Sequence, residues 1–223
     1  MEPSAAMREY LAEIYRLQEY EPTVSTTSLA ERLNVTAPAV PRMLKRLKSA
    51  GYVRHVPYQG VELTERGLKE ALLEIRRHRI LEVFLVRVMG FTWDETHKYA
   101  DNLGKGLDDT LTQRMAEMTH FPTRCPHGEP IPDAKGNLPA VDDLCILNLN
   151  VGYKGHISRV RTHEPEKLRY FATLGLIPET HFEIVGRAPF NGPMRLRVGR
   201  EDIVLGVELT QSLWVSPTDS SGK

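Results

Sequence analysis

The sequence predicts an α+β protein of three consecutive parts: a winged helix-turn-helix, a helical middle part and a small β-barrel of SH3 type. Three short segments of helical periodicity come first, followed by two short alternating segments, which is the plan of a winged helix. Helical periodicity then continues to about His120. Beyond a proline-rich connector, short alternating runs are separated by glycine, proline and asparagine, which is typical of small barrels.

The amino-acid composition is that of an ordinary globular chain. Its 223 residues suit two or three small domains, and a hydrophobic content of 41% is enough to pack their cores. Lys+Arg and Asp+Glu both number 29, so a nucleic-acid partner has to be argued from local charge. No window approaches the roughly 18 apolar residues of a membrane span, and the N-terminus lacks an apolar signal core. We therefore expect a cytoplasmic protein without a membrane segment, with both cysteines as free thiols.

The N-terminal part predicts three helices and a hairpin. The helices are expected over residues 7–19, over residues 28–33 and from about residue 36 to residue 51. Ser28 and Glu31 have the spacing of a capping box at the start of the second helix. Two short strands are expected on either side of Tyr58, Gln59 and Gly60, so these residues should form the tip of the wing.

The middle and C-terminal parts differ in periodicity. The middle part predicts a long helix ending at Gly90, followed by helices within residues 93–106 and 107–118. Several prolines make residues 121–143 an irregular connector. Strands are expected within residues 144–160, 181–190, 194–206 and 208–215, with one helix over residues 165–175. The predicted domain bounds are 1–66, 67–143 and 144–217, with a disordered tail at 218–223.

The third helix and the wing form a basic segment. No acidic residue occurs from Thr36 to Arg54, although the chain as a whole is neutral. The basic residues of this segment are Arg42, Lys45, Arg46, Lys48 and Arg54. We expect them to contact DNA phosphates. The short side chains of Thr36, Ala37 and Pro38 should approach base edges, and Tyr58 and Gln59 should contact DNA from the wing.

Pro41 conflicts with a helix that starts at Thr36. A proline at the fifth helical position removes a backbone hydrogen bond and costs roughly 3 kcal/mol in an ordinary helix interior. Either the helix begins later, or its first turn is reshaped.

Ligand-type side chains recur in the middle part. His78 and Glu82 are four residues apart on the long helix, and His97 and Asp101 repeat that spacing on the next one. Cys125 and His127 flank a proline in the connector, in the stretch RCPHGEPIP. Imidazole, carboxylate and thiolate are ligands of divalent transition metals, so the pattern favours a metal site.

Together these features resemble the diphtheria toxin repressor family of iron- and manganese-dependent transcriptional regulators. The resemblance covers nearly the whole chain, and the helix RRHRILEVFL and the loop CPHGEPIP are fairly specific to it. The loop is most similar to the manganese-sensing branch. The resemblance implies homodimers that bind palindromic operators when loaded with metal, with a helical dimerisation domain between the winged helix and the SH3-like barrel.

The resemblance also implies a set of ligands. One site is expected to contain His78, Glu82, Cys125, His127 and, from the barrel, Glu164. His163 is the runner-up to Glu164, and His97 matches a ligand position in some iron-sensing relatives. The ion should be Mn(II) on resemblance, although Fe(II) or Zn(II) would also fit these donors.

A second family site is incomplete in this sequence. Glu9 and Asp101 match two of its ligand positions, but Gly104 and Lys105 stand where a glutamate and a histidine are expected. Three outcomes are open: the ion is lost, the Lys105 ammonium takes its place by pairing with Glu9 or Asp101, or a rearranged site forms from Glu9, His97, Asp101 and Asp108.

The function expected from these features is a metal-dependent repressor of metal-uptake genes rather than an enzyme. A regulator that senses thiol oxidation through Cys125 is the alternative, and a zinc hydrolase is the weaker one. We expect double-stranded operator DNA and a second copy of the chain as partners, and no small organic cofactor. The physiological metal, the number of ions and the operator sequence stay open.

Overall fold

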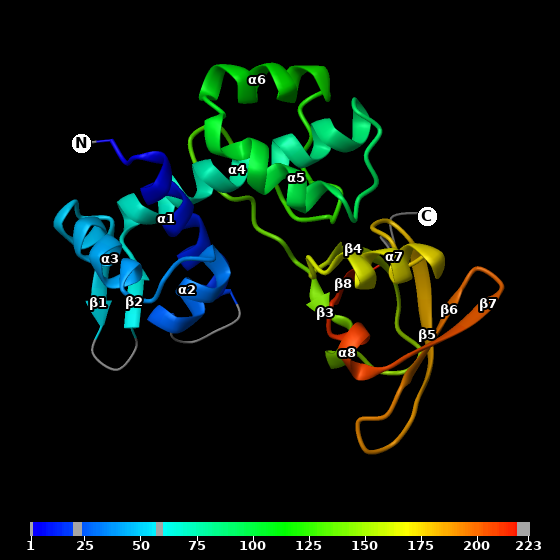
Figure 1. Ribbon diagram of the computed structural model, residues 1–223. Coiled ribbons are helices and arrows are strands. Elements are labelled where there is room, and N and C mark those ends of the chain that lie inside the picture. Colours follow the sequence, from blue (N-terminus) through cyan, green and yellow to red (C-terminus); the bar gives the residue numbers. More distant parts are fainter. Residues whose placement is uncertain (1, 20–23, 57–59, 218–223) are drawn as a thin grey trace. The chain divides into compact units, whose positions relative to one another are not determined.

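The structure is a computed structural model that describes residues 2–19, 24–56 and 60–217 (Figure 1). It consists of two compact units. The first contains Met1–Arg79, Leu103–Gln113 and Ile131–Pro139, and the second contains Ile80–Asn102, Arg114–Pro130 and Ala140–Lys223. One division between them falls inside an unbroken helix. Within the described ranges, no helix is both long enough and apolar enough to cross a membrane.

The N-terminal winged helix is confirmed. Its helices are α1 (Ala5–Gln18), α2 (Thr26–Leu33) and α3 (Ala39–Ser49), and its hairpin consists of β1 (Val53–Val56) and β2 (Gly60–Leu63). The two strands pair antiparallel beside α3 (Figure 1). Apolar side chains from all three helices and from the hairpin pack into one core, which contains Leu11, Ile14, Leu29, Leu47 and Tyr52. The predicted wing residues Tyr58 and Gln59 lie outside the described residues.

Two helix starts differ from the prediction. The cap of α2 is Ser25, whose Oγ accepts from Ser28 N at 2.9 Å, so the predicted capping box at Ser28 is wrong. Helix α3 begins at Ala39 rather than near Thr36, which places Pro41 in its first turn. The first four N–H groups of a helix have no partner within it, so Pro41 removes no helical hydrogen bond there.

The long helix α4 (Glu65–Arg87) starts directly after the wing. Thr64 Oγ1 donates to Gly51 O at 2.8 Å and accepts from Gly67 N at 3.1 Å, which fixes the junction. Gly67 also packs against Tyr52 O so closely that a Cβ would overlap with it. The remaining helices of the middle part are α5 (Thr96–Leu103), the 3₁₀ turn η1 (Gly104–Gly106) and α6 (Asp109–Met118).

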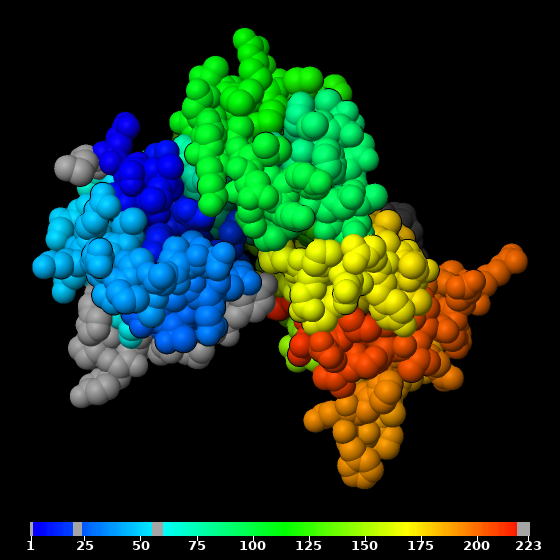
Figure 2. Space-filling view, in the orientation of Figure 1, coloured from blue at the N-terminus to red at the C-terminus, as the bar shows by residue number. Residues whose placement is uncertain are grey.

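The C-terminal part is a six-stranded antiparallel sheet with the order β3-β8-β4-β5-β6-β7. Its elements are β3 (Leu144–Cys145), η2 (Ile146–Asn148), β4 (Lys154–Val160), α7 (Pro165–Thr173), β5 (His181–Arg187), β6 (Met194–Val198), β7 (Glu201–Leu205), α8 (Val207–Thr210) and β8 (Leu213–Pro217). The run after Leu144 was expected to be one strand, but it turns into η2 after Cys145. The loop after β5 and the β6–β7 hairpin stand away from the rest of the sheet (Figure 2).

Candidate metal centre

A buried carboxylate, a thiol and an imidazole meet beside α4. Glu82 lies on α4, whereas Cys125 and His127 lie on the loop after α6. Glu82 Oε1 is 3.7 Å from His127 Nδ1, which is 3.9 Å from Cys125 Sγ. The three side chains are buried and offer ligand atoms within 4.8 Å of one another. We call Glu82, Cys125 and His127 the thiol group.

The backbone of the loop is bound to strand β4. Gly128 N donates to Cys125 O and closes a turn, and Val160 N on β4 donates to His127 O, both at 2.9 Å. Gly128 has a φ of +86°, and a Cβ there would overlap with Ser158 O. Only glycine combines that backbone conformation with such a close approach, so Gly128 allows the loop to lie on β4.

A buried polar network anchors the same loop. Arg159 Nη1 donates to Glu129 Oε2 at 3.1 Å, and Arg159 Nη2 donates to Asp143 Oδ1 at 2.7 Å. Ser158 Oγ donates to Asp143 Oδ2 at 2.6 Å, and the Arg159 guanidinium lies 4.9 Å from the centre of the Trp214 ring. Buried charges are tolerated when they are paired and hydrogen-bonded in this way. The network therefore holds Glu129, two residues after His127, against the barrel.

The contacts of His127 leave its Nδ1 facing Glu82 and Cys125, because its Nε2 is bonded elsewhere. Its Nε2 donates to Trp93 O at 2.8 Å, because a carbonyl can only accept. Burial lowers the pKa of His127, but the Glu82 carboxylate and the hydrogen bond with Cys125 raise it by more, so this pKa lies well above the ordinary histidine value. A raised pKa favours the protonated ring, and binding of a metal ion at Nδ1 requires that nitrogen without its proton.

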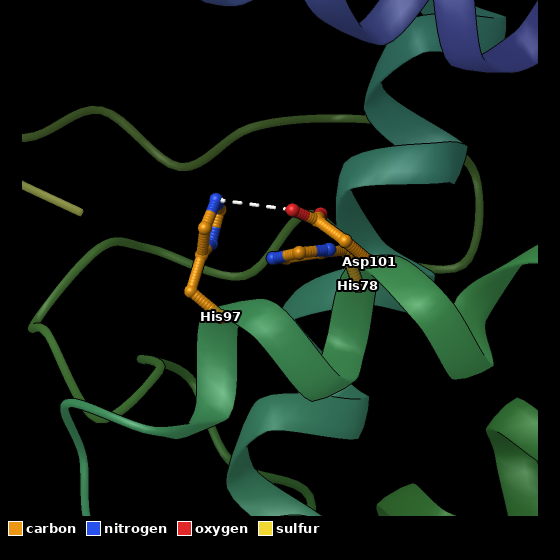
Figure 3. A group of neighbouring side chains, drawn as sticks. All are labelled: His78, His97 and Asp101. Atoms are coloured by element: carbon orange, nitrogen blue, oxygen red, sulfur yellow. Dashed lines mark ion pairs between the residues drawn. The ribbon is translucent and has the colours of Figure 1, made fainter. Parts of the chain in front are cut away.

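A second group of donors adjoins the first. His97 Nε2 and Asp101 Oδ2, one turn apart on α5, are 3.5 Å from each other (Figure 3). His78 offers a ring nitrogen within 4.8 Å of both, and it lies one turn before Glu82 on the unbroken helix α4 (Figure 3). We call His78, His97 and Asp101 the imidazole group. His97 Nδ1 is also 3.4 Å from Glu82 Oε1, so the two groups meet at Glu82.

The structure distributes the expected ligands differently from the single set that the resemblance implies. His78 belongs to the imidazole group rather than to the thiol group. Glu164 lies in neither, since it stands at the start of α7 and accepts from Lys167 Nζ at 2.8 Å. Its neighbour His163 stacks on His97, with ring centroids 3.9 Å apart and planes 16° apart. From the barrel, His163 is therefore the side chain that reaches the donors.

Several residues that shape the centre carry no sequence signal. Trp93 accepts from His127 through its carbonyl oxygen, and Glu129, Asp143 and Arg159 anchor the loop. Their roles depend on contacts between segments far apart in the chain, which spacing cannot reveal. His163, beside Glu164 in RTHEPEKL, is the residue that the sequence offered as the runner-up to Glu164.

The donors fit a divalent transition metal. A thiolate with imidazoles binds Zn(II) tightly by intrinsic affinity, whereas the carboxylates of Glu82 and Asp101 make the centre suitable for Mn(II) or Fe(II). The fit is supported by burial, since Glu82, Cys125 and His127 are 2%, 6% and 1% exposed and yet present donor atoms to one another.

The residues of the expected second family site lie on α1, η1 and the start of α6. Lys105 Nζ is 3.5 Å from Glu9 Oε1, and both side chains are exposed. Asp108 caps α6, with its Oδ1 accepting from Leu111 N at 2.7 Å. Asp101 belongs to the imidazole group instead. A lysine ammonium thus lies beside the carboxylate of Glu9.

The basic face of the winged helix is open. Thr36, Ala37 and Pro38 are exposed in the turn before α3, and the α2–α3 segment, in the blue shades, is uncovered on the face shown in Figure 2. The exposed basic residues of α3 are Arg42, Lys45, Arg46 and Lys48. Arg54 on β1 donates to Glu62 on β2 at 2.7 Å, so part of its charge is already neutralised.

Comparison with known families assigns each part of the chain. Residues 3–61 match the iron dependent repressor N-terminal DNA binding domain, and residues 64–133 match the iron dependent repressor metal binding and dimerisation domain. Residues 146–217 match the FeoA domain. The predicted fold class is thereby confirmed, and the first two families are repressors rather than enzymes.

Individual relatives agree with the family models. The iron-dependent repressor IdeR of Mycobacterium tuberculosis is 33% identical over 144 residues, which is 63% of this chain and 63% of IdeR, so the match spans under two thirds of that relative. The diphtheria toxin repressor of Corynebacterium diphtheriae is 27% identical over 161 residues, which is 72% of this chain and 68% of that protein.

Solved structures match over a longer range. A manganese-dependent transcriptional repressor in complex with manganese superimposes with a TM-score of 0.88 at 34% identity, covering 95% of this chain and all of that one. The manganese regulator SloR superimposes with a TM-score of 0.78 at 26% identity, covering 98% of this chain and all of its own. Given these matches along all three parts, the chain belongs to the iron-dependent repressor family of metal-dependent, DNA-binding transcriptional repressors.

Proposed function

We propose that this protein is a manganese-dependent repressor of metal-uptake genes that binds a palindromic operator as a homodimer. The observation that carries this proposal is the thiol group, in which Glu82, Cys125 and His127 converge in a buried position. The long match to a manganese-dependent repressor supports Mn(II), while IdeR, named as iron-dependent, keeps Fe(II) as the alternative. We also keep Zn(II), for which the thiolate is a good ligand.

The open basic face of α3 is the proposed DNA-contacting surface. Arg42, Lys45 and Arg46 are exposed on α3 and can neutralise phosphates, which supplies affinity without sequence preference. Thr36 and Ala37 lie in the turn that leads into α3, where short side chains allow close approach to base edges. The proposed dimer would place two such faces on the two halves of a palindrome.

The proposed ligands come from three segments. Glu82 is supplied by α4, Cys125 and His127 by the connector loop, and His163 by the segment between β4 and α7. A bound divalent ion would supply positive charge at the point where these segments meet. The chain's own contribution is to hold them in place: Gly128 lets the loop approach β4, and Trp93 orients the His127 ring.

An affinity switch is the proposed mechanism. Metal binding changes operator affinity only if the dimer has two arrangements of its DNA-contacting faces and the metal binds one arrangement more tightly. Such coupling is typically about 1–3 kcal/mol, or roughly 5- to 150-fold in affinity. We expect the thiol group to contribute to this coupling because it joins α4, which begins directly after the wing, to the loop bound on the barrel.

The test is operator binding with and without Mn(II). A binding sequence would first be selected from random duplexes with Mn(II) present, and its affinity then measured by fluorescence anisotropy for the metal-loaded and the chelator-stripped protein. We expect the loaded form to bind at least about 5-fold more tightly. Glu82→Gln should lose this difference, whereas Glu166→Gln, at an exposed position on α7, should keep it.

Equal affinity of the stripped and the loaded protein would disprove the proposal. Binding that survives the chelator but is lost after mild oxidation would instead support the alternative, a thiol sensor based on Cys125. Metal-stimulated hydrolysis of a substrate without DNA binding would point to the zinc hydrolase.

A further inference from the structure

The hairpin that β5 and β6 form (residues 181–198, the β5–β6 hairpin) ends in an unusual turn. Gly192 N donates to Pro189 O at 3.0 Å and closes the turn. The two central residues, Phe190 and Asn191, have φ values of +57° and +55°. Positive φ at both central positions is the pattern of a type I′ turn, which glycine, asparagine and aspartate favour. Asn191 fits that preference, whereas Phe190 does not.

Phe190 does not contribute to the packing of the barrel. It is 100% exposed, and the loop that carries it stands away from the rest of the sheet (Figure 2). A bulky residue at positive φ is strained, and strained residues cluster at functional sites. Aromatic side chains are also enriched where proteins bind other molecules. A phenylalanine that is held out in this way therefore indicates contact with a partner.

The same hairpin is basic. No acidic residue occurs from Ile184 to Arg200, although the chain as a whole is neutral. The basic residues of this segment are exposed, and all of them are arginines: Arg187, Arg195, Arg197 and Arg200. A local excess of positive charge favours a negatively charged partner.

This charge is only partly neutralised within the barrel. Asp202 on β7 accepts from Arg197 Nε at 2.9 Å, and the same carboxylate lies 3.9 Å from Arg195 Nε. One aspartate thus faces two guanidinium groups. Arg187 Nη2 donates to the carbonyl oxygen of Leu147 at 2.7 Å, a contact that leaves its positive charge in place. Arg187 and Arg195 belong to the last two residue pairs of the strand ladder before the turn, so positive charge remains beside the tip.

We propose that the β5–β6 hairpin is a second DNA-contacting element, whose arginines contact phosphates along the minor groove and whose Phe190 enters between two base pairs. Phenylalanine is one of the apolar wedges with which minor-groove proteins separate base steps. Arginine is attracted by the strong negative potential of a narrow minor groove. The hairpin would add a contact of low sequence preference to those proposed for α3, and this role does not depend on which metal is bound.

DNA fits the hairpin better than a membrane surface does. Membrane binding of a surface element scales with the apolar area that it buries, and residues 188–193 contain one large apolar side chain, Phe190. A duplex offers a phosphate for each arginine and a base step for the ring. Residues 3–61 match a DNA binding domain, so a second contact on the same chain profits from a high local concentration of DNA.

Bending of a bound duplex tests the wedge. A duplex selected with Mn(II) present would carry a fluorescent donor and acceptor at its two ends, and energy transfer would be measured with saturating full-length protein. An inserted side chain kinks DNA by about 20–90°. We expect the wild type to raise energy transfer and Phe190→Asn to lose most of that rise. Ile177→Ala, at an exposed position of the barrel, is the matched control and should bend the duplex like the wild type.

A thermal melt checks that the Phe190→Asn variant is folded. Asparagine adopts positive φ more readily than phenylalanine does, and Phe190 has no packing to lose. The variant should therefore melt at the wild-type temperature or above it, so a loss of bending cannot come from unfolding.

The salt dependence of DNA binding tests the arginines. Removing one phosphate contact lowers the slope of log affinity against log salt concentration by about 1. We expect this change for Arg187→Gln and for Arg195→Gln, on the selected duplex and on random duplexes alike. Lys154→Ala, at an exposed position paired with Glu183 in the same sheet, should keep the wild-type slope.

The outcomes separate the hairpin from the proposed function. Wild-type bending by Phe190→Asn, or wild-type salt slopes for both arginine variants, would overturn the hairpin as a DNA-contacting element and leave metal-dependent operator binding intact. Phe190-dependent binding to vesicles of phosphatidylserine and phosphatidylcholine, with unchanged DNA bending, would overturn it in favour of a membrane contact. A wild-type protein that binds no duplex at all would overturn both proposals.

Discussion

Glu13 shows how a single buried charge stabilises the winged helix. Its side chain projects from α1 and is 7% exposed; Oε1 accepts from Arg32 Nε at 2.6 Å and Oε2 accepts from Arg16 Nη1 at 3.1 Å. Burial raises the pKa of Glu13, but the two arginines lower it by more, so the net pKa is below the ordinary glutamate value. The ionised form is thus the one that the fold prefers.

A pKa that is lower in the folded state than in the unfolded state determines how the stability changes with pH. The contribution of Glu13 is fully present above the unfolded-state pKa, about 4.3, and is lost as the pH falls through the lower folded-state value. We expect Glu13→Gln to lower the free energy of unfolding by about 1–2 kcal/mol at pH 7. The difference from wild type should shrink as the pH falls below about 4.

Urea unfolding from pH 2 to pH 7 measures this dependence. Glu31→Gln is the control, since Glu31 is exposed on α2. A Glu13→Gln difference that stays constant across the range would show that the pairing with arginine does not operate.

At the same scale, sequence reasoning singled out donor side chains that the structure brings together, and their role as metal ligands stays a prediction. His78, Glu82, Cys125 and His127 were singled out by spacing and resemblance, and all four lie in the two donor groups. Glu164 and His163 are adjacent, and the resemblance favoured the glutamate. Only the path of the chain after β4 decides which of the two points at His97, and one-residue differences of this kind are invisible in spacing.

Among the elements, the connector loop depends on one glycine, Gly128. Gly128 combines a positive φ with contact to Ser158 O, so an alanine there would be strained and would push the loop off β4. We expect Gly128→Ala to lower the stability of the protein by about 1–3 kcal/mol and to weaken Mn(II) binding, because Cys125 and His127 lie on the same turn.

Calorimetric melting and metal titration give the two measurements for Gly128→Ala. Gly206→Ala is the matched control, since Gly206 has no neighbour within 4 Å of a built Cβ and a negative φ of −65°. If Gly128→Ala had the same melting temperature and the same Mn(II) affinity as the wild type, the close approach of the loop to β4 would not be required.

The elements themselves were largely predictable. Periodicity identified the three N-terminal helices, the long helix α4 and the strands of the barrel, because amphipathic faces have to match the core that they cover. Boundaries were less predictable. The start of α3 depended on Pro41, whose missing N–H is harmless only in a first turn, and the cap of α2 depended on which of two serines accepts the hydrogen bond.

On the scale of the whole molecule, an ion pair joins the DNA-binding part to the helical middle part. Lys105 Nζ on η1 lies 3.5 Å from Glu9 Oε1 on α1. We propose that this ammonium takes the place of a second family ion, so that α1 and η1 are joined without metal. Exposed pairs of this type contribute about 0.2–1 kcal/mol.

Replacing Lys105 tests this role. We expect Lys105→Ala to change the Mn(II) concentration needed for half-maximal operator binding by roughly 1.4- to 5-fold at low salt, and the change should fade as salt rises. Lys154→Ala is the matched control, because Lys154 forms an equally long, exposed ion pair with Glu183 in the barrel. An identical metal titration for wild type and Lys105→Ala would rule out the substitution of an ion by Lys105.

The two cysteines give the molecule a built-in reporter. Cys125 is 6% exposed, whereas Cys145 is partly accessible. A thiol-specific alkylating reagent should therefore label Cys145 promptly and Cys125 only during transient openings. The ratio of the two labelling rates therefore measures how often the region around Cys125 opens, with Cys145 as the internal reference. Mass spectrometry can follow both rates without an added dye.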